Sequence, residues 1–236
     1  MPNTKDISVK DIRLNVLVYG KSGTGKTTLG CCFPKAYVFD FDKGLLSQRG
    51  RDVDYDTYKG LTAYQDFEMK LKELEGNCPY ETLVVDSLTT MQEYLMDKIL
   101  MANHKKMPTM HEWNVMIAEL KDLFSRMTKM APHTIITAHE ELKQDEITGE
   151  IVIQPLCVGK KLPPMLPMWF DEVYRAQVGR GKDGKPEFAL LTSSDVKYTA
   201  RTRLGVLDAV EVWSKDGKMV NVFDLIMGKV EASGKA

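Results

Sequence analysis

The chain of 236 residues has few cysteines, no long apolar run and no excess of either charge. Its four cysteines include no C-x-x-C pair, so we expect reduced thiols and a reducing compartment. No apolar run approaches the length of a membrane span and the first residues show no signal-peptide core, so a cytoplasmic location without membrane contact is predicted. The formal net charge of −1 excludes a global basic field, so a site for a polyanion would have to be local.

One stretch organises the rest of the chain. Residues 19–28, YGKSGTGKTT, match the pattern G-x-x-x-x-G-K-[ST] between an apolar run at 15–19 and a helix expected over 26–32. Glycines let backbone N–H groups converge on phosphate oxygens, and a lysine adds positive charge near the outer phosphates. The predicted nucleotide-binding residues are Gly20, Lys21, Ser22, Gly23, Thr24, Gly25, Lys26, Thr27 and Thr28. The Thr27 hydroxyl is also a candidate ligand of Mg²⁺.

Three further apolar runs predict buried parallel strands, at 36–40, 82–86 and 134–138. Between them, apolar residues at helical spacing predict helices over 62–76, 88–101 and 111–130. The first of these helices opens with a possible capping box at Thr62 and Gln65. Ligands of open parallel sheets bind outside the carboxyl ends of the strands, so the polar residues that end these runs are expected to meet.

The last third of the chain has a different texture. Turn signals separate short alternating runs at 151–153, 173–178, 187–192 and 197–201, which predicts antiparallel strands. The fold class is therefore α/β, with a mainly parallel central sheet flanked by helices and antiparallel strands added at one edge in the C-terminal third. We expect a single domain over 13–228, a flexible arm or edge strand at 1–12 and a disordered tail at 229–236.

Two acidic residues at strand ends are catalytic candidates. Asp86 ends the run 82–86, where an acid that holds a magnesium ion is expected, although it could instead cap the following helix. Asp42 follows the run 36–40 and is the candidate general base for an attacking water. Asp40 is the alternative base, and an acid that stabilises a turn is the non-catalytic interpretation.

His139 follows the run 134–138 and is a candidate sensor of the terminal phosphate. Thr137 or Glu140 could share that task. A single histidine at this position is also compatible with a purely structural role.

Six segments together resemble the RecA-like ATPase core: GKSGTGKTT at 20–28, VFDFD at 38–42, LVVDS at 83–87, ITAHE at 136–140, DEVYR at 171–175 and RTR at 201–203. They are similar to the small RecA-type P-loop ATPases encoded by bacteriophages, over about residues 13–205. The resemblance implies Mg²⁺-dependent ATP hydrolysis by a protein that acts on single-stranded DNA in recombination, annealing or replication in the host cytoplasm. Asp42 departs from the family, which usually has a glutamate as the base.

The resemblance also implies a homo-oligomer, a ring or a filament, and a single-strand-binding protein as a further partner. In such assemblies a basic residue of one subunit often reaches the terminal phosphate bound by its neighbour. Arg201 and Arg203 resemble the residues that do so in ring helicases, and two solvated arginines are the alternative.

Residues 140–167 correspond to the region where RecA-like proteins carry a DNA-binding loop. The candidate contacts are Lys143, Lys160 and Lys161. Several acids lie among these lysines, and the segment 140–167 contains no aromatic residue. A surface hairpin without a role in DNA binding therefore stays an alternative.

Two other functions remain compatible with the sequence. A nucleotide-dependent switch or assembly protein would use ATP to order a segment and bind a protein partner. A small-molecule kinase is disfavoured because no arginine-rich lid is evident between the later strands.

Overall fold

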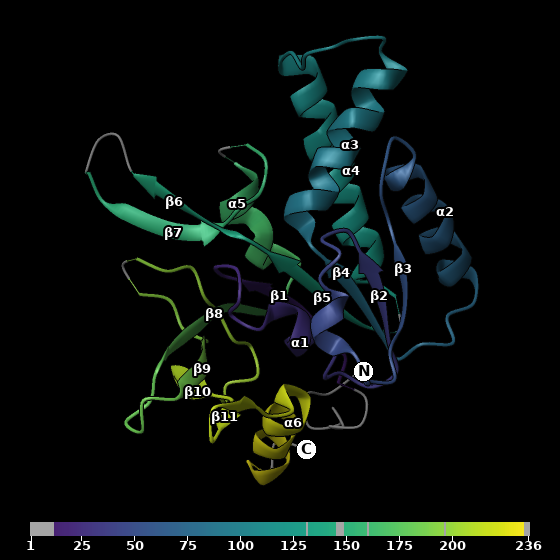
Figure 1. Ribbon diagram of the computed structural model, residues 1–236. Coiled ribbons are helices and arrows are strands. Elements are labelled where there is room, and N and C mark those ends of the chain that lie inside the picture. The colour runs from purple at the N-terminus through teal and green to yellow at the C-terminus, as the bar shows by residue number, and fades with distance from the viewer. Residues whose placement is uncertain (1–11, 131, 145–148, 160, 196, 234–236) are drawn as a thin grey trace, which may run out of the picture.

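The computed structural model describes residues 12–130, 132–144, 149–159, 161–195 and 197–233. An eight-stranded sheet runs through the molecule in the order β10-β9-β8-β1-β5-β4-β2-β3 (Figure 1). Neighbours from β8 to β3 are parallel, whereas β9 and β10 are antiparallel. The strands are β1 Asn15–Tyr19, β2 Ala36–Asp40, β3 Asp54–Thr57, β4 Thr82–Asp86, β5 His133–Ala138, β8 Glu172–Arg180, β9 Pro186–Leu191 and β10 Val210–Val212. The predicted fold class is confirmed.

Helices cover both faces of this sheet (Figure 1). The helices are α1 Lys26–Gly30, α2 Ala63–Gly76, α3 Leu88–Ala102, α4 Met110–Met127, α5 Leu162–Met165 and α6 Val222–Ala232. One core joins α2, α3 and α4 to the sheet through buried residues such as Phe67, Leu95 and Phe124. A second core joins α1 and α6 to the opposite face through Leu29 and Ile226. Packing of apolar faces, rather than intrinsic propensity, therefore stabilises these helices.

The register of the parallel strands explains why polar residues gather at one edge of the sheet. Tyr19 pairs with Ala138, and Asp40 pairs with Asp86, so the carboxyl ends of β1, β5, β2 and β4 are level. We call this boundary the carboxyl edge. The opposite boundary, where these strands begin at Asn15, Ala36, Thr82 and His133, is the amino edge.

Two threonines show how similar sequence patterns give different helix starts. Thr109 has an extended backbone, and it forms a full capping box with Glu112 at the start of α4. Thr62 precedes α2 with a helical backbone, φ −96° and ψ −1°, and its hydroxyl donates to Asp66 without capping a backbone N–H. The capping box predicted at Thr62 and Gln65 is wrong, because only an extended N-cap aims its oxygen at the first turn.

The structure differs from the sequence-based expectation in three other places. Residues 197–201 form no strand among the described residues and make only isolated bridges, Ile153 with Tyr198 and Val173 with Arg201. The edge strand β3 is exposed along its length and polar, so no apolar pattern announced it. The disordered tail was expected to begin at residue 229, but α6 continues to Ala232 and the side chain of Val230 is buried. The arm expected at 1–12 lies, up to residue 11, outside the described residues.

Two small sheets complete the fold. Strands β6 Glu140–Gln144 and β7 Ile151–Pro155 form an antiparallel hairpin that leaves the carboxyl edge directly after β5. Strands β11 Ser214–Lys215 and β12 Lys218–Met219 form the second. The first of these hairpins occupies part of the segment 140–167 for which the sequence analysis weighed a DNA-binding loop against a surface hairpin.

Candidate functional site

The loop that carries the glycine-rich motif connects β1 to α1 at the carboxyl edge. The backbone N–H of Gly20 donates to the Ala138 carbonyl oxygen over 3.2 Å, which fixes the start of the loop beside β5. Gly23 and Gly25 adopt φ angles of +79° and +87°, a left-handed conformation that glycine reaches without strain. A Cβ on Gly23 would meet no heavy atom within 4 Å, so this side of the loop is open to a ligand.

Lys26 is buried at the base of the loop. Its Nζ donates to the carbonyl oxygens of Gly20 and Lys21 over 3.0 and 2.8 Å. Burial lowers the pKa of Lys26, and the negative charges of Asp86 and Asp42 oppose that shift. A lysine held against the loop in this way fits the binding of a phosphate group there.

The remaining loop residues divide into two groups. Lys21 and Ser22 are exposed at the tip. Thr24 and Thr28 are buried, the first donating to the Lys21 carbonyl oxygen over 2.8 Å and the second accepting from Gln48 Nε2 over 2.8 Å. The loop is therefore preorganised by hydrogen bonds within it and by one from Gln48.

Thr27 and Asp86 form the part of the site that suits a metal ion. Thr27 Oγ1 donates to Asp86 Oδ2 over 2.7 Å, and Thr137 donates to the other carboxylate oxygen. Burial raises the pKa of Asp86 while the two hydroxyl donors lower it. A Cβ on Gly44 would lie 3.6 Å from both Thr27 Oγ1 and Asp86 Oδ2, so backbone without a side chain faces this oxygen pair.

Mg²⁺ uses one or two protein oxygens and completes its shell with phosphate and water oxygens, so Thr27 and Asp86 fit this ion. No group of three or more His, Cys, Asp or Glu side chains suited to a metal occurs within the described part of the chain. The N-cap of α3 is Ser87 and not Asp86, because the Ser87 side chain accepts a hydrogen bond from the Thr90 N–H.

The two candidate bases occupy different surroundings. Asp40 is buried, and it accepts from the Gly44 N–H over 3.2 Å and from Thr57 Oγ1 over 3.3 Å. These bonds stabilise the turn after β2. Asp42 is partly exposed, and its backbone N–H donates to the Asp86 carbonyl oxygen over 3.1 Å. The geometry therefore favours Asp42 over Asp40 as the base.

His139 lies beside Asp42. Its Nε2 is 3.5 Å from Asp42 Oδ2, and its backbone N–H donates to Thr89 Oγ1 over 2.9 Å. The other carboxylate oxygen of Asp42 accepts from the hydroxyl groups of Ser87 and Thr90. The structure thus brings together Lys26, Thr27, Asp42, Asp86 and His139 at one edge, as expected.

Arg201 and Arg203 do not belong to this cluster. Arg201 is bridged to Val173 near the start of β8, and its guanidinium donates to the Pro167 carbonyl oxygen over 2.9 Å. Arg203 forms an ion pair of 2.6 Å with Asp171, next to the first residue of β8. Both lie towards the amino edge, so within one chain neither lies at the loop.

The predicted DNA contacts are spread over several elements. Lys143 lies on β6, Lys161 precedes α5 and is exposed, and Lys160 lies outside the described residues. The hairpin borders a hollow of about 410 Å³ beside the glycine-rich loop, lined by Lys21, Ser22, His139, Glu140, Leu142 and Ile153. The structure therefore brings the hairpin, but not a continuous basic surface, next to the loop.

Sequence reasoning missed a buried ion pair at this edge. Arg175 Nε lies 3.0 Å from Glu140 Oε2, and both side chains are about one-tenth exposed. In the sequence, Arg175 belongs only to the family-like segment DEVYR at 171–175, and Glu140 was a possible partner of His139 in sensing phosphate. No local sequence signal marks the pair, because it depends on β5 and β8 lying on either side of β1 with level ends.

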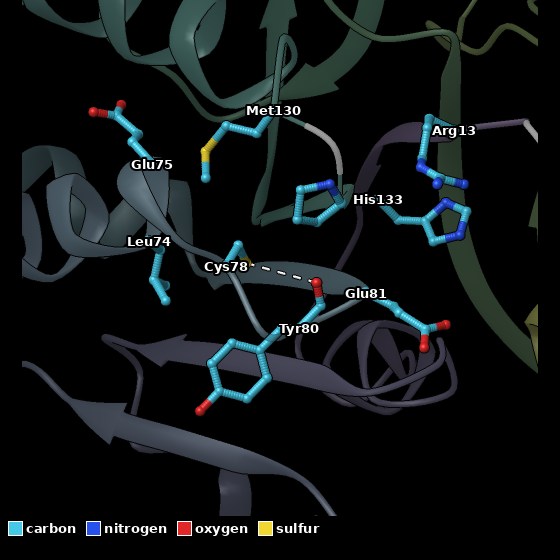
Figure 2. A pocket seen from close by; sticks show the side chains of 9 residues that line it. Arg13, Leu74, Glu75, Cys78, Tyr80, Glu81, Met130 and His133 are labelled. Atoms are coloured by element: carbon cyan, nitrogen blue, oxygen red, sulfur yellow. Dashed lines mark hydrogen bonds between the residues drawn. The ribbon is translucent and has the colours of Figure 1, made fainter.

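A second hollow, of about 450 Å³, lies at the amino edge. Figure 2 shows Arg13, His133 and Glu81 on one side of it and Glu75 and Met130 on the other. His133 Nδ1 accepts from the Leu14 N–H over 3.1 Å. This hollow contains none of the predicted site residues.

None of the helices within the described ranges is long and apolar enough to cross a membrane.

Comparisons with known proteins give one family. The sequence profile of a family described as an AAA domain matches residues 12–204. No curated protein gives a significant match. A solved structure of a KaiC-like protein from the hyperthermophilic archaeon Pyrococcus horikoshii OT3 aligns with a TM-score of 0.45 and 15% identity, over 75% of this chain and 77% of that one. Because the profile spans most of the chain and includes every strand-end residue described above, the chain belongs to the AAA domain family of P-loop ATPases.

Proposed function

We propose that the protein hydrolyses ATP with Mg²⁺ at the carboxyl edge and that this reaction serves work on single-stranded DNA. The observation that supports hydrolysis is that two pairs of side chains, one suited to a metal ion and one suited to proton transfer, lie at the same edge as Lys26. The oxygen pair of Thr27 and Asp86 suits Mg²⁺. The pair of Asp42 and His139 suits proton transfer.

The residues would divide the chemistry between them. Lys26 would bind the outer phosphates through its ammonium group, and loop N–H groups would bind the remaining phosphate oxygens. Mg²⁺, when bound by Thr27 and Asp86, would neutralise phosphate charge. Asp42 Oδ2 would accept a proton from the attacking water, with His139 holding that oxygen in place.

The first test is Lys26→Ala. Loss of a charge-assisted bond of about 1.5–3 kcal/mol predicts nucleotide binding weaker by roughly 10- to 100-fold. Turnover should fall further, by about 10³-fold, because the same charge acts on the transition state. Lys72→Ala, an exposed lysine on α2, is the control. Unchanged ATP hydrolysis in Lys26→Ala would contradict the assignment of this site.

The DNA part of the proposal rests on the family resemblance and on the position of the hairpin beside the loop. The hairpin carries the exposed apolar residues Leu142 and Ile151 and also Lys143. Single-stranded DNA bound across the hairpin would be adjacent to His139, the residue that follows β5. Binding there could therefore alter hydrolysis.

This part is tested with a single-stranded oligonucleotide of mixed sequence. We expect turnover to rise with DNA and the affinity to fall steeply with salt, as counterion release requires. Lys143→Glu should weaken binding, and Lys72→Glu should not. If DNA neither binds nor changes turnover at low salt, the protein does not act on single strands.

A second candidate is a nucleotide-dependent switch. Asp42 is shorter than the usual glutamate, and one of its oxygens is already engaged by Ser87 and Thr90, which favours slow turnover. ATP would then stabilise one state for a protein partner. Very slow turnover that is insensitive to DNA, together with capture of a partner that depends on ATP, would support the switch over the DNA-directed ATPase.

Assembly into a ring or filament is part of the proposal, with Arg201 or Arg203 acting on the neighbouring subunit. Mixing Lys26→Ala subunits with subunits that carry both Arg201→Ala and Arg203→Ala tests it. Only an assembly that shares sites between subunits can recover turnover on mixing. No recovery, or a monomer in solution with ATP present, would remove the arginines from the site.

A further inference from the structure

We infer that Arg175 is a positioning residue that acts through Glu140 to hold His139 beside Asp42. The inference rests on the hydrolysis proposed above and adds a residue to its machinery. It concerns the ion pair that the sequence did not reveal.

The pair is tightly built. Arg175 Nε is 3.0 Å from Glu140 Oε2, and a second guanidinium nitrogen is 3.5 Å from Glu140 Oε1. A third guanidinium nitrogen donates to Gln177 Oε1 over 3.0 Å, and the guanidinium carbon lies 4.3 Å from the centre of the Tyr198 ring. With bonds and ring contact together, Arg175 has one arrangement rather than many.

The pair joins two strands that do not touch each other. Glu140 follows β5 by two residues, and Arg175 lies in β8, with β1 between these strands. Tyr19, the last residue of β1, pairs with Ala138 on one side and Arg175 on the other. The ion pair therefore crosses the end of β1 at the point where the glycine-rich loop begins.

The same region fixes the base of the hairpin. Tyr198, which stacks on Arg175, is bridged to Ile153 of β7. The hydroxyl group of Tyr19 donates to the Thr199 carbonyl oxygen over 2.7 Å. Arg175 is thus surrounded by the end of β1, the start of β6 and the segment that binds β7.

His139 is held at three points. Its own N–H donates to Thr89 Oγ1, its carbonyl oxygen accepts from the Leu156 N–H over 2.7 Å, and the next residue, Glu140, is bound by Arg175. The 3.5 Å approach of its imidazole to Asp42 depends on all three. Loss of Arg175 would leave the Glu140 carboxylate buried without its cation, and the carboxylate would move towards water and take His139 with it.

The glycine-rich loop has other supports. Gly20 is fixed by the Ala138 carbonyl oxygen, and Lys26 by two loop carbonyl groups. Neither support involves Arg175 or Glu140. Loss of the ion pair should therefore impair proton transfer at Asp42 far more than nucleotide binding.

The experiment compares Arg175→Met, Glu140→Gln and the double variant. We expect Arg175→Met to lower kcat by about 10- to 100-fold, the cost of a misplaced catalytic group, with nucleotide affinity changed less than about 3-fold. The double variant buries no lone charge, so its melting temperature should recover. Its kcat should stay low, because no ion pair holds His139. Arg175→Lys should recover part of kcat.

Arg126→Met is the matched control, since it removes a partly buried arginine that pairs with Glu75 far from the carboxyl edge. It should leave kcat unchanged. The inference is overturned if the double variant recovers kcat together with stability, or if nucleotide affinity falls in parallel with kcat in Arg175→Met.

Hydrogen exchange separates this inference from the hydrolysis proposal. In Arg175→Met, amides over residues 139–144 should exchange faster, while those of the glycine-rich loop should not. If the wild type binds nucleotide but shows no turnover, the proposed hydrolysis fails, and the exchange pattern still decides whether Arg175 holds this segment. Unchanged exchange over 139–144 overturns the inference in either case.

Discussion

Strand β5 has a histidine at each end, and the two lie in opposite surroundings. His133 is its first residue, is 6% exposed, and accepts a hydrogen bond from the Leu14 N–H. His139 follows its last residue, has a side chain that is 37% exposed, and faces Asp42. The same residue type is therefore a structural acceptor at the amino edge and a partner of a carboxylate at the carboxyl edge.

The contrast extends to the groups around each histidine. At the amino edge, burial lowers the pKa of His133 to about 4, which keeps the ring neutral. At the carboxyl edge, burial raises the pKa of Asp86 and lowers that of Lys26, so both charged forms are disfavoured. Burial thus favours the neutral histidine that accepts a hydrogen bond at the amino edge, whereas at the carboxyl edge it opposes the ionised forms that a phosphate and metal site uses, at a cost to folding. Such a cost is typical of functional sites.

The largest expected effect is that of Asp86→Asn. The amide keeps the shape but loses the charge that would hold Mg²⁺, so turnover should fall by about 10³-fold. Because the folded state raises the pKa of Asp86, its ionisation disfavours folding at neutral pH, and the neutral variant should be at least as stable as the wild type. Turnover assays and urea unfolding at pH 7.5 measure the two effects.

A variant that loses both stability and turnover would show that Asp86 is a structural carboxylate. Thr82→Val is a useful control on the same strand, because Thr82 Oγ1 donates to the Pro34 carbonyl oxygen over 2.7 Å at the amino edge. That change should lower stability without affecting nucleotide binding.

The carboxyl edge could be predicted well from the sequence for a local reason. A glycine-rich motif after an apolar run, and acids at the ends of such runs, are written in contiguous residues. The amino edge was not predicted, since Arg13, Glu81 and His133 meet only through strand order. The ion pair of Arg175 and Glu140 was not predicted for the same reason.

Backbone conformation was the other source of error. The alternating residues at 197–201 have the pattern of a strand, yet this segment crosses β7 and β8 at single bridges and pairs along neither. Edge strand β3 shows the opposite case. Its residues are exposed and lack a strand-like apolar pattern, yet they form a strand because they pair with β2. Pattern alone cannot supply a pairing partner.

His139→Asn sharpens the comparison at the functional end. We expect turnover to fall by about 100-fold, the lower end for a group that assists proton transfer, with unfolding stability nearly unchanged because the ring is partly exposed. Nucleotide affinity, measured by fluorescence titration, should change little. A loss of nucleotide affinity equal to the loss of turnover would make His139 a binding residue rather than a partner of Asp42.

His133→Asn tests the structural end of the same strand. The folded state lowers the pKa of His133 from 6.5 to about 4, so this group contributes stability above pH 6.5 that is lost as the pH falls towards 4. Between pH 7.5 and pH 5 the wild type should lose about 2 kcal/mol through this residue. Asparagine can still accept from the Leu14 N–H but does not titrate, so that part of the pH dependence should vanish.

Urea unfolding of both proteins at pH 7.5, 6 and 5 isolates this effect, because other titrating groups cancel in the difference. At pH 7.5 the variant should be less stable, since the ring of His133 packs against Phe33 and Phe223 at centroid distances of 5.7 and 5.5 Å. Turnover of the folded variant should be normal. Parallel pH profiles would mean that His133 does not titrate with unfolding.

The smallest effect is expected from Lys35→Ala, also at the amino edge. Lys35 Nζ lies 2.8 Å from Glu81 Oε1, but the two side chains are 68% and 52% exposed. Water and salt screen such a pair, so the melting temperature should shift by no more than about 1 °C.

Glu81 also borders the hollow that contains His133, and its negative charge favours protonation of that ring. With Lys35 removed, the charge of Glu81 should act more strongly on His133, and the stability lost between pH 7.5 and pH 5 should be slightly smaller than in the wild type. This difference should disappear when Lys35→Ala is combined with His133→Asn. A difference that persists in the combined variant would mean that Glu81 acts on another group.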